Sequence, residues 1–388
     1  MLLVLATIAL LTVLVMDIVR SATVRIQLAA HQRDEAAAEA LAMGGIEFYR
    51  LFLIASKQVD DSPLVEMISQ MIPGGINSAS LWEIVPEIST STLRLLLAAG
   101  GDADEAKQIE ASGGLTDEQN AMTRDGNGVH TTLKKPFLDF DGDFVATVKD
   151  EDGRIYVGNF RATTMVELQK DVTAGVIHGM MSDEADSAWL RSINIDPWEL
   201  VGDLADWTDA DDQRIFEGGS EDQLYDQGDD PYKSKNAGFD SVEEIRLVHN
   251  WERDDLWQRY GRLFTIYGSG KININTAKGE VMKGLFNAYI SPPQNDWSLV
   301  MDAIHAYRST PVAMGGGIFR TPQDFVTFLR TVAPGTVDDA MANAITTKST
   351  VFRVTSEGRV GKSKVAIEAV FDFEKNNRVG KVVYWHVQ

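Results

Sequence analysis

The feature that most constrains this chain is its uncharged N-terminal stretch. Residues 1–16 (MLLVLATIALLTVLVM) carry no ionisable side chain, and the first charged residues are Asp17, Arg20 and Arg25. As a helix rising ~1.5 Å per residue, this run spans roughly 24 Å, whereas a lone membrane span needs about 20 residues. The run lacks the basic start and the small-residue cleavage site of a secretory leader. We therefore expect residues 1–16 to anchor the chain in lipid.

The helix is expected to continue beyond this anchor. Residues 21–56 contain no proline and are rich in Ala, Gln, Glu and Arg. Apolar or small residues recur there at helical spacing, at Ala22, Ile26, Ala29, Ala36, Ala40, Met43, Ile46 and Phe48. The pattern predicts one long helix that begins in lipid and ends packed on a head domain. A signal anchor followed by a short amphipathic linker fits the same residues equally well.

Charge and cysteine content narrow the ligands that the head can bind. The chain has 388 residues, with 36 Lys and Arg against 57 Asp and Glu, so its formal net charge is −21. This charge repels nucleic acid and anionic lipid surfaces and favours cations. The absence of cysteine excludes disulfides, iron–sulfur clusters and thiolate zinc sites. No nucleic-acid partner is expected.

Alternating residues predict strands at both ends of the head. The stretch from Phe144 to Phe160 alternates around Asp152-Gly153, a strong hairpin signal. Three further strands, separated by Glu357-Gly358 and Asn376-Asn377, predict a terminal meander; they are expected at residues 351–355, 365–373 and 379–387. Residues 60–128 are interpreted as a connection whose best-ordered part is a helix near residues 91–98.

Helical patterns fill the region between these β-rich pieces. They occur at residues 184–193, 241–248, 280–288, 297–307 and 322–329. The expected fold class is α+β: the N-terminal helix packs on an antiparallel sheet made of the first hairpin and the meander, and a mostly α-helical domain is inserted between them. The predicted domains are residues 1–56, 57–171, 172–347 and 348–388.

The strongest local motif is acidic. Residues 205–225 (ADWTDADDQRIFEGGSEDQLY) gather carboxylates in one short glycine-containing stretch. Clustered carboxylates repel one another and suit Ca²⁺, which accepts six to eight flexible oxygen ligands. The spacing is not that of an EF-hand loop. A solvated acidic loop with helix-capping aspartates is the alternative interpretation.

A second motif concerns packing rather than chemistry. Residues 271–285 (KININTAKGEVMKGL) with residues 317–325 resemble the helix-hairpin-helix and SAM-like group. The intervening residues 287–296 lack the Gly-x-Gly turn with which DNA-binding members hold a phosphate. Together with the negative charge, this favours protein packing over DNA binding.

No arrangement of residues indicates catalysis. The six histidines are scattered without a His-x-x-x-His or His-Glu-x-x-His pair, and no Gly-x-Ser-x-Gly motif occurs. Gly268 to Lys271 is interpreted as a turn, because it lacks the spacing of a phosphate loop. The chain is therefore not expected to be an enzyme. The remaining enzymatic alternative is a membrane-anchored periplasmic hydrolase that uses a metal in the acidic cluster.

The N-terminal layout resembles the mature N-terminus of type IV pilin-like proteins, with Leu5 where most pilins carry glutamate. Six segments in order along the chain resemble the K-type minor pseudopilin of type II secretion (GspK). They are DEDGRI, DWTDADD, GGSED, NAGFDSVEEIRLV, ININTA and VVYWHV. The long segment at residues 60–128 departs from that pattern.

The resemblance implies a function and a set of partners. It implies a subunit at the pseudopilus tip that primes assembly with the I-type and J-type minor pseudopilins and the major pseudopilin, and supports export across the outer membrane. It also implies an inner-membrane location with a periplasmic head, methylation of Met1, and structural Ca²⁺. The candidate ligands are Asp206, Asp209, Asp211, Glu221 and Asp222. A minor pilin at the tip of a type IV pilus is the alternative function.

Overall fold

The computed structural model describes most of the chain. It covers residues 1–60, 81–93, 141–158, 160–226, 231–310, 316–374 and 379–388. The helix predicted near residues 91–98, most of the connection at residues 60–128 and the turn at Asn376-Asn377 lie mostly or wholly outside these residues.

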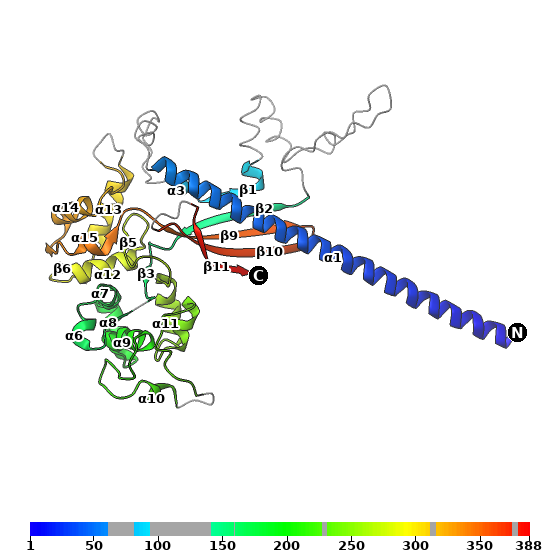
Figure 1. Cartoon of the computed structure of the whole chain (residues 1–388), viewed down its shortest axis with the longest axis horizontal. Coiled ribbons are helices and arrows are strands. Elements are labelled where there is room, and N and C mark those ends of the chain that lie inside the picture. Colours follow the sequence, from blue (N-terminus) through cyan, green and yellow to red (C-terminus); the bar gives the residue numbers. More distant parts are fainter. Residues whose placement is uncertain (61–80, 94–140, 159, 227–230, 311–315, 375–378) are drawn as a thin grey trace, which may run out of the picture.

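One uninterrupted helix forms the N-terminal part, as predicted. Helix α1 (Leu2–Asp60) is 59 residues long, and its N-terminal half extends away from the rest of the molecule (Figure 1). Its C-terminal half lies along a sheet and buries one face, with Ala38, Ala42, Ile46, Tyr49 and Leu53 fully buried. This spacing of three or four residues is the apolar stripe of a surface helix. Within the described part of the chain, no helix has the length and apolarity of a membrane span.

A five-stranded antiparallel sheet packs on this helix. The strand order is β1-β2-β9-β10-β11, and every neighbouring pair is antiparallel. The strands are β1 (Glu87–Ser89), β2 (Asp143–Asp150), β9 (Val351–Val360), β10 (Ser363–Asp372) and β11 (Lys381–Val387). The predicted terminal meander is confirmed, and β2 and β9 are neighbours although about half of the chain separates them. Everything between them therefore leaves the sheet and returns at adjacent strands.

The predicted hairpin at Asp152-Gly153 is wrong. Strand β3 (Ile155–Tyr156) pairs in parallel with β4 (Phe264–Thr265) and not with β2. Asp152 is only 3% exposed, and its Oδ2 accepts hydrogen bonds from the backbone N–H groups of Thr350 (2.5 Å) and Val351 (3.1 Å). The Asp-Gly pair therefore does not form an exposed turn between two strands. It lies where the chain leaves the sheet, and the Asp152 carboxylate binds the backbone at the start of β9.

The predicted turn at Glu357-Gly358 is also wrong, since both residues lie inside β9. A Cβ atom at Gly358 would come within 2.0 Å of the Ala38 carbonyl oxygen. The glycine is needed because α1 crosses the strand so closely, and not because the chain turns. The turn follows at Gly361, whose φ of +57° is in the left-handed region.

Short helices fill the region between β2 and β9. They are α6 (Met165–Leu168), α7 (Val172–Met180), α8 (Glu184–Ser192), α9 (Pro197–Thr208), α10 (Asp222–Tyr225), η2 (Val242–Leu247), α11 (Asp254–Tyr260), η3 (Gly261–Leu263), α12 (Gly279–Tyr289), α13 (Ser298–Ser309), α14 (Pro322–Val332) and α15 (Met341–Ala344). All five predicted helices are present, with residues 242–247 in 3₁₀ form, whereas the other helices of this region, α7, α9 and α11 among them, were not predicted. Three two-stranded pairings, β3-β4, β5-β8 and β6-β7, connect them; the remaining elements are α3 (Leu81–Ile84), β5 (Ile272–Asn273), β6 (Ile290–Ser291), β7 (Thr336–Val337) and β8 (Ile345–Thr346).

Two hydrophobic clusters result. One joins α1 to the sheet, and the other fills the helical region, which lies towards one end of the sheet (Figure 1). The division into domains at the predicted residues stays a prediction.

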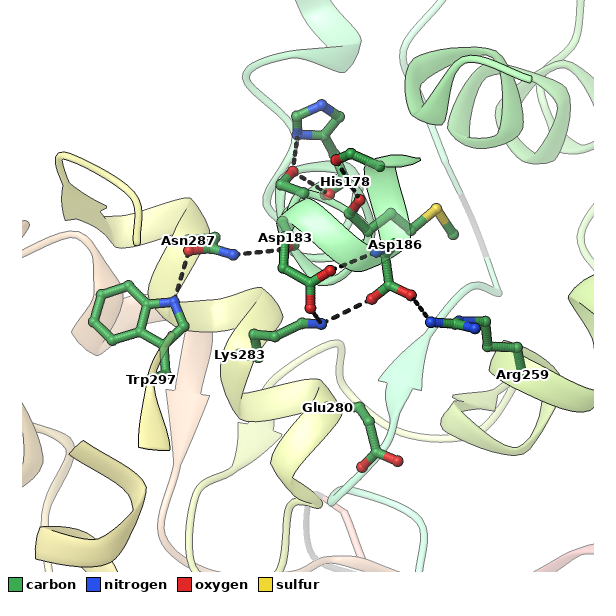
Figure 2. Close-up of polar contacts among 12 residues, drawn as sticks. His178, Asp183, Asp186, Arg259, Glu280, Lys283, Asn287 and Trp297 are labelled. Carbon is green, nitrogen blue, oxygen red and sulfur yellow. Dashed lines mark hydrogen bonds and ion pairs between the residues drawn. The ribbon is translucent and has the colours of Figure 1, made fainter. Parts of the chain in front are cut away.

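An ionic network ties the helical region together (Figure 2). Lys283 Nζ of α12 lies 2.5 Å from Asp183 Oδ2 and 2.8 Å from Asp186 Oδ2, and Arg259 of α11 pairs with Asp186 from the other side. Burial raises the pKa of Asp183, but Lys283 and the Asp186 backbone N–H outweigh it and hold this pKa below its ordinary value. The network joins α8, α11 and α12 through charges that are mostly withdrawn from water.

Two adjacent glycines, Gly44 and Gly45, allow the close approach of α1 to the sheet to be tested with a matched pair of variants. A Cβ at Gly45 would lie 2.2 Å from Ser356 Oγ and 2.7 Å from the Phe144 ring, whereas at Gly44 it would meet nothing within 4 Å. We expect Gly45→Ala to lower the free energy of unfolding by about 1–3 kcal/mol, and Gly44→Ala to raise it by up to about 1 kcal/mol through helix propensity. Urea denaturation of both variants measures this, and equal effects would contradict the packing described.

The half-buried Lys283 provides a second test. Lys283→Met leaves the Asp183 and Asp186 carboxylates without their shared cation, so we expect a loss of about 3–5 kcal/mol. The control is Arg330→Met, because Arg330 pairs with Asp339 on the surface, where the side chains are 47% and 84% exposed. That variant should lose less than about 1 kcal/mol. Similar urea midpoints for the two variants would show that the network contributes little.

Candidate metal centre

Helix α9 and the loop after it position the acidic motif. Asp196 caps the helix start through a bond from the Trp198 N–H to its Oδ1 (2.7 Å), and Pro197 occupies the first turn. Asp206 lies in the last turn, and Asp209 is the C-terminal cap. Beyond α9 the chain folds back through three residues with positive φ, Glu217, Gly218 and Gly219. The Glu221 N–H then donates to the Asp212 carbonyl oxygen (3.2 Å), which returns Glu221 to the end of α9.

Three carboxylates converge where the loop returns. One oxygen each of Asp206, Asp209 and Glu221 lies within 4.8 Å of the other two. The three residues are 2%, 5% and 1% exposed. Buried charges of one sign at this spacing need a cation or protons to balance them.

The unused oxygens fit a cation. Asp206 Oδ1 accepts from the Ile215 N–H (3.0 Å) and Asp209 Oδ1 from the Asp211 N–H (3.3 Å). In contrast, the second oxygen of each aspartate and both oxygens of Glu221 are buried without a hydrogen-bond partner. Buried polar atoms are rarely left in this state. The backbone therefore orients the aspartates while leaving oxygen ligands free, as a hard divalent ion such as Ca²⁺ requires.

The pKa values of the three carboxyl groups reflect their burial and their closeness to one another. Burial and neighbouring carboxylates raise the pKa of Asp206 to about 8, of Glu221 to about 7 and of Asp209 to about 6. In the absence of a cation, burial thus favours the protonated forms.

The five predicted ligands divide into two groups. The structure brings Asp206, Asp209 and Glu221 together. Half-buried Asp211 is adjacent but accepts from the Gln213 N–H (2.8 Å), and Asp222 pairs with Lys233 Nζ at 2.5 Å. Which of the five bind a metal stays a prediction.

Sequence reasoning missed one polar group beside the loop. Asn236 Nδ2 donates to the Asp211 carbonyl oxygen and to Asp212 Oδ1, both at 3.0 Å, while its Oδ1 is buried without a partner. Its φ of +50° is a conformation in which asparagine is enriched. The residue follows the acidic motif of residues 205–225 in the sequence, so the spacing within that motif could not reveal it.

The raised pKa values predict an unusual pH dependence. A carboxyl group whose pKa is higher in the folded state stabilises the fold below its unfolded pKa, and this stability is lost as pH rises through the folded pKa. We expect the metal-free protein to melt at a higher temperature at pH 5 than at pH 8, and Ca²⁺ to restore stability at pH 8.

Thermal melts with EDTA or with Ca²⁺ measure this effect. Asp209→Asn should reduce both the pH dependence and the Ca²⁺ response. Glu217→Gln, which alters an exposed side chain in the same loop, is the matched control and should leave both unchanged. Melting temperatures insensitive to EDTA at pH 8 would rule out a structural metal here.

Comparison with known proteins finds a family similar to this region. Residues 187–268 match the family described as "Type II secretion system (T2SS), protein K". A chain in the solved structure of the GspK-GspI-GspJ complex from the enterotoxigenic Escherichia coli type 2 secretion system is 15% identical, with a TM-score of 0.46, covering 64% of this chain and 80% of that one. No curated protein matches this chain. Proteins of the K family are structural secretion components and not enzymes, and the segment of this chain that contains α9 and the acidic motif is similar to part of that family's proteins.

Proposed function

We propose that this protein is a tip subunit of a type II secretion pseudopilus, where it primes assembly with other minor pseudopilins and so supports export across the outer membrane. The observation that carries the proposal is the two-part character of α1. Its C-terminal half is packed on the sheet, whereas its N-terminal half projects from the rest of the molecule (Figure 1). Apolar side chains between Leu10 and Leu28 on the projecting half are exposed.

The projecting half of α1 needs a covering surface. Leu10, Val13 and Met16 are 71%, 69% and 71% exposed, and exposed apolar residues continue to Ile26 and Leu28. A contiguous apolar surface of this kind marks a membrane or protein interaction site. Asp17, Arg20 and Arg25 interrupt the second part of it. We assign residues 1–16 to inner-membrane lipid and the part up to Leu28 to helices of sister subunits.

The proposed partners are the I-type and J-type minor pseudopilins and the major pseudopilin. A complex of the K, I and J types is described for the Escherichia coli protein, and an equivalent complex is proposed for this chain. The family match favours secretion over the alternative of a type IV pilus.

Calcium is proposed as a structural ion of the head. Asp206, Asp209 and Glu221 would hold it, because they supply buried oxygens without hydrogen-bond donors. The bound ion would supply the positive charge that these carboxylates lack. The loop would then keep its folded path at neutral pH.

The interaction role of α1 can be tested separately from folding. We expect Ile26→Glu to reduce co-purification with co-expressed I-type and J-type subunits without changing the melting temperature, because Ile26 is 69% exposed. Leu299→Glu is the matched control, since Leu299 of α13 is 83% exposed and lies on the head. This control should retain both properties.

Removal of residues 1–28 is the stronger form of this experiment. The truncated chain keeps the buried α1 residues from Ala38 to Leu53, so it should remain folded by circular dichroism. It should leave the membrane fraction and lose its partners. If membrane retention and partner capture both survive the truncation, the proposed function is wrong.

A further inference from the structure

A second group of potential metal ligands lies on the same helix as the acidic loop. Glu199 and Asp203 are four residues apart on α9, so they share one face, and His249 approaches them from the turn after η2. One ligand atom of each lies within 4.8 Å of the other two. The acidic motif of residues 205–225 contains none of the three.

One carboxylate oxygen of Asp203 has no hydrogen-bond partner. Its side chain is fully buried, and its Oδ2 lies 3.2 Å from His249 Nδ1 and accepts from Asn250 Nδ2 at 2.8 Å. Its Oδ1 is buried without any hydrogen-bond partner. Protonation of His249 would strengthen the contact to Oδ2 but would leave Oδ1 unsatisfied. This arrangement suits metal binding, because the hydrogen bonds to Oδ2 hold the carboxylate in place while Oδ1 stays available as a ligand.

The donor set differs from that of the acidic loop. An imidazole nitrogen with two carboxylates suits a borderline divalent cation such as Zn²⁺, while Ca²⁺ prefers oxygen ligands only. His249 is 30% exposed at its side chain and Glu199 is half-buried, so an ion can enter from solvent. Three protein ligands leave a fourth position for water.

We propose that Glu199, Asp203 and His249 form a second metal site, selective for a transition-type divalent cation of the Zn²⁺ class. Asn250 is a positioning residue that holds Asp203 through its amide. The site is separate from the acidic motif of residues 205–225, and it does not depend on the proposed role in secretion.

Titration of Zn²⁺ into the full chain tests the proposal. The chain is purified in detergent without a histidine tag and kept in excess Ca²⁺, so that the acidic loop is occupied. We expect calorimetry to show one Zn²⁺ equivalent, and Co²⁺ to give visible absorption bands when bound. His249→Gln and Glu199→Gln should each weaken Zn²⁺ binding by at least about tenfold. His305→Gln, which changes an exposed histidine of α13, is the control and should bind as the parent does.

Three results would overturn the proposal. The first is the absence of Zn²⁺ binding by the parent chain. The second is unchanged binding by both His249→Gln and Glu199→Gln, provided that their melting temperatures match that of the parent. The third is loss of Zn²⁺ binding in Asp209→Asn with full binding in His249→Gln, because the ion would then occupy the acidic loop. In each of these cases the effect of Ca²⁺ on the melting temperature still tests the acidic motif of residues 205–225 separately.

Discussion

The close packing of α1 against the sheet is the constraint on which the rest of the structure depends. Ala38, Ala42 and Gly45 face Gly358 and Ser356 of β9, and an added Cβ at either glycine would overlap the opposing chain. Small residues on both sides bring the helix near enough for Ile46, Tyr49 and Leu53 to be fully buried. Since β9 is central and β2 pairs beside it, this contact also fixes the two strands from which the helical region leaves and to which it returns.

A buried polar seam then joins that region to the sheet. Fully buried Glu151 receives Arg353 Nε at 2.6 Å, and Arg353 also pairs with Glu368 of β10. Asp152 caps the start of β9, while its carbonyl oxygen accepts from the Asn273 N–H at 2.7 Å. Buried ion pairs contribute little net stability, but removal of one partner is costly. We interpret the seam as fixing the direction in which the helical region leaves the sheet.

Sequence reasoning succeeded where local pattern decides the structure and failed where distant residues do. Periodicity identified α1, the meander and five helices. The Asp152-Gly153 hairpin failed because Asp152 bonds to Thr350, 198 residues away, and Gly358 was misread because its neighbour is α1 and not a turn. Helix α9 escaped prediction because Asp203 and Asp206 occupy buried positions that an amphipathic pattern reserves for apolar residues. The acidic motif located the candidate centre, but convergence of three carboxylates required the loop return at Gly218 and Gly219.

The burial of Asp203 and Asp206 makes the folding of α9 depend on its ligands. Burial raises the pKa of Asp206, one turn from Asp203, to about 8, so its ionisation in the absence of a cation raises the free energy of the folded state at neutral pH. An ion that binds only the folded state, present at 100 times its dissociation constant, increases the free energy of unfolding by about 2.7 kcal/mol. This is a large fraction of the stability of an ordinary domain. If both sites bind as proposed, the helical region reaches full stability only where divalent cations are available, whereas α1 and its sheet pack around a separate hydrophobic core.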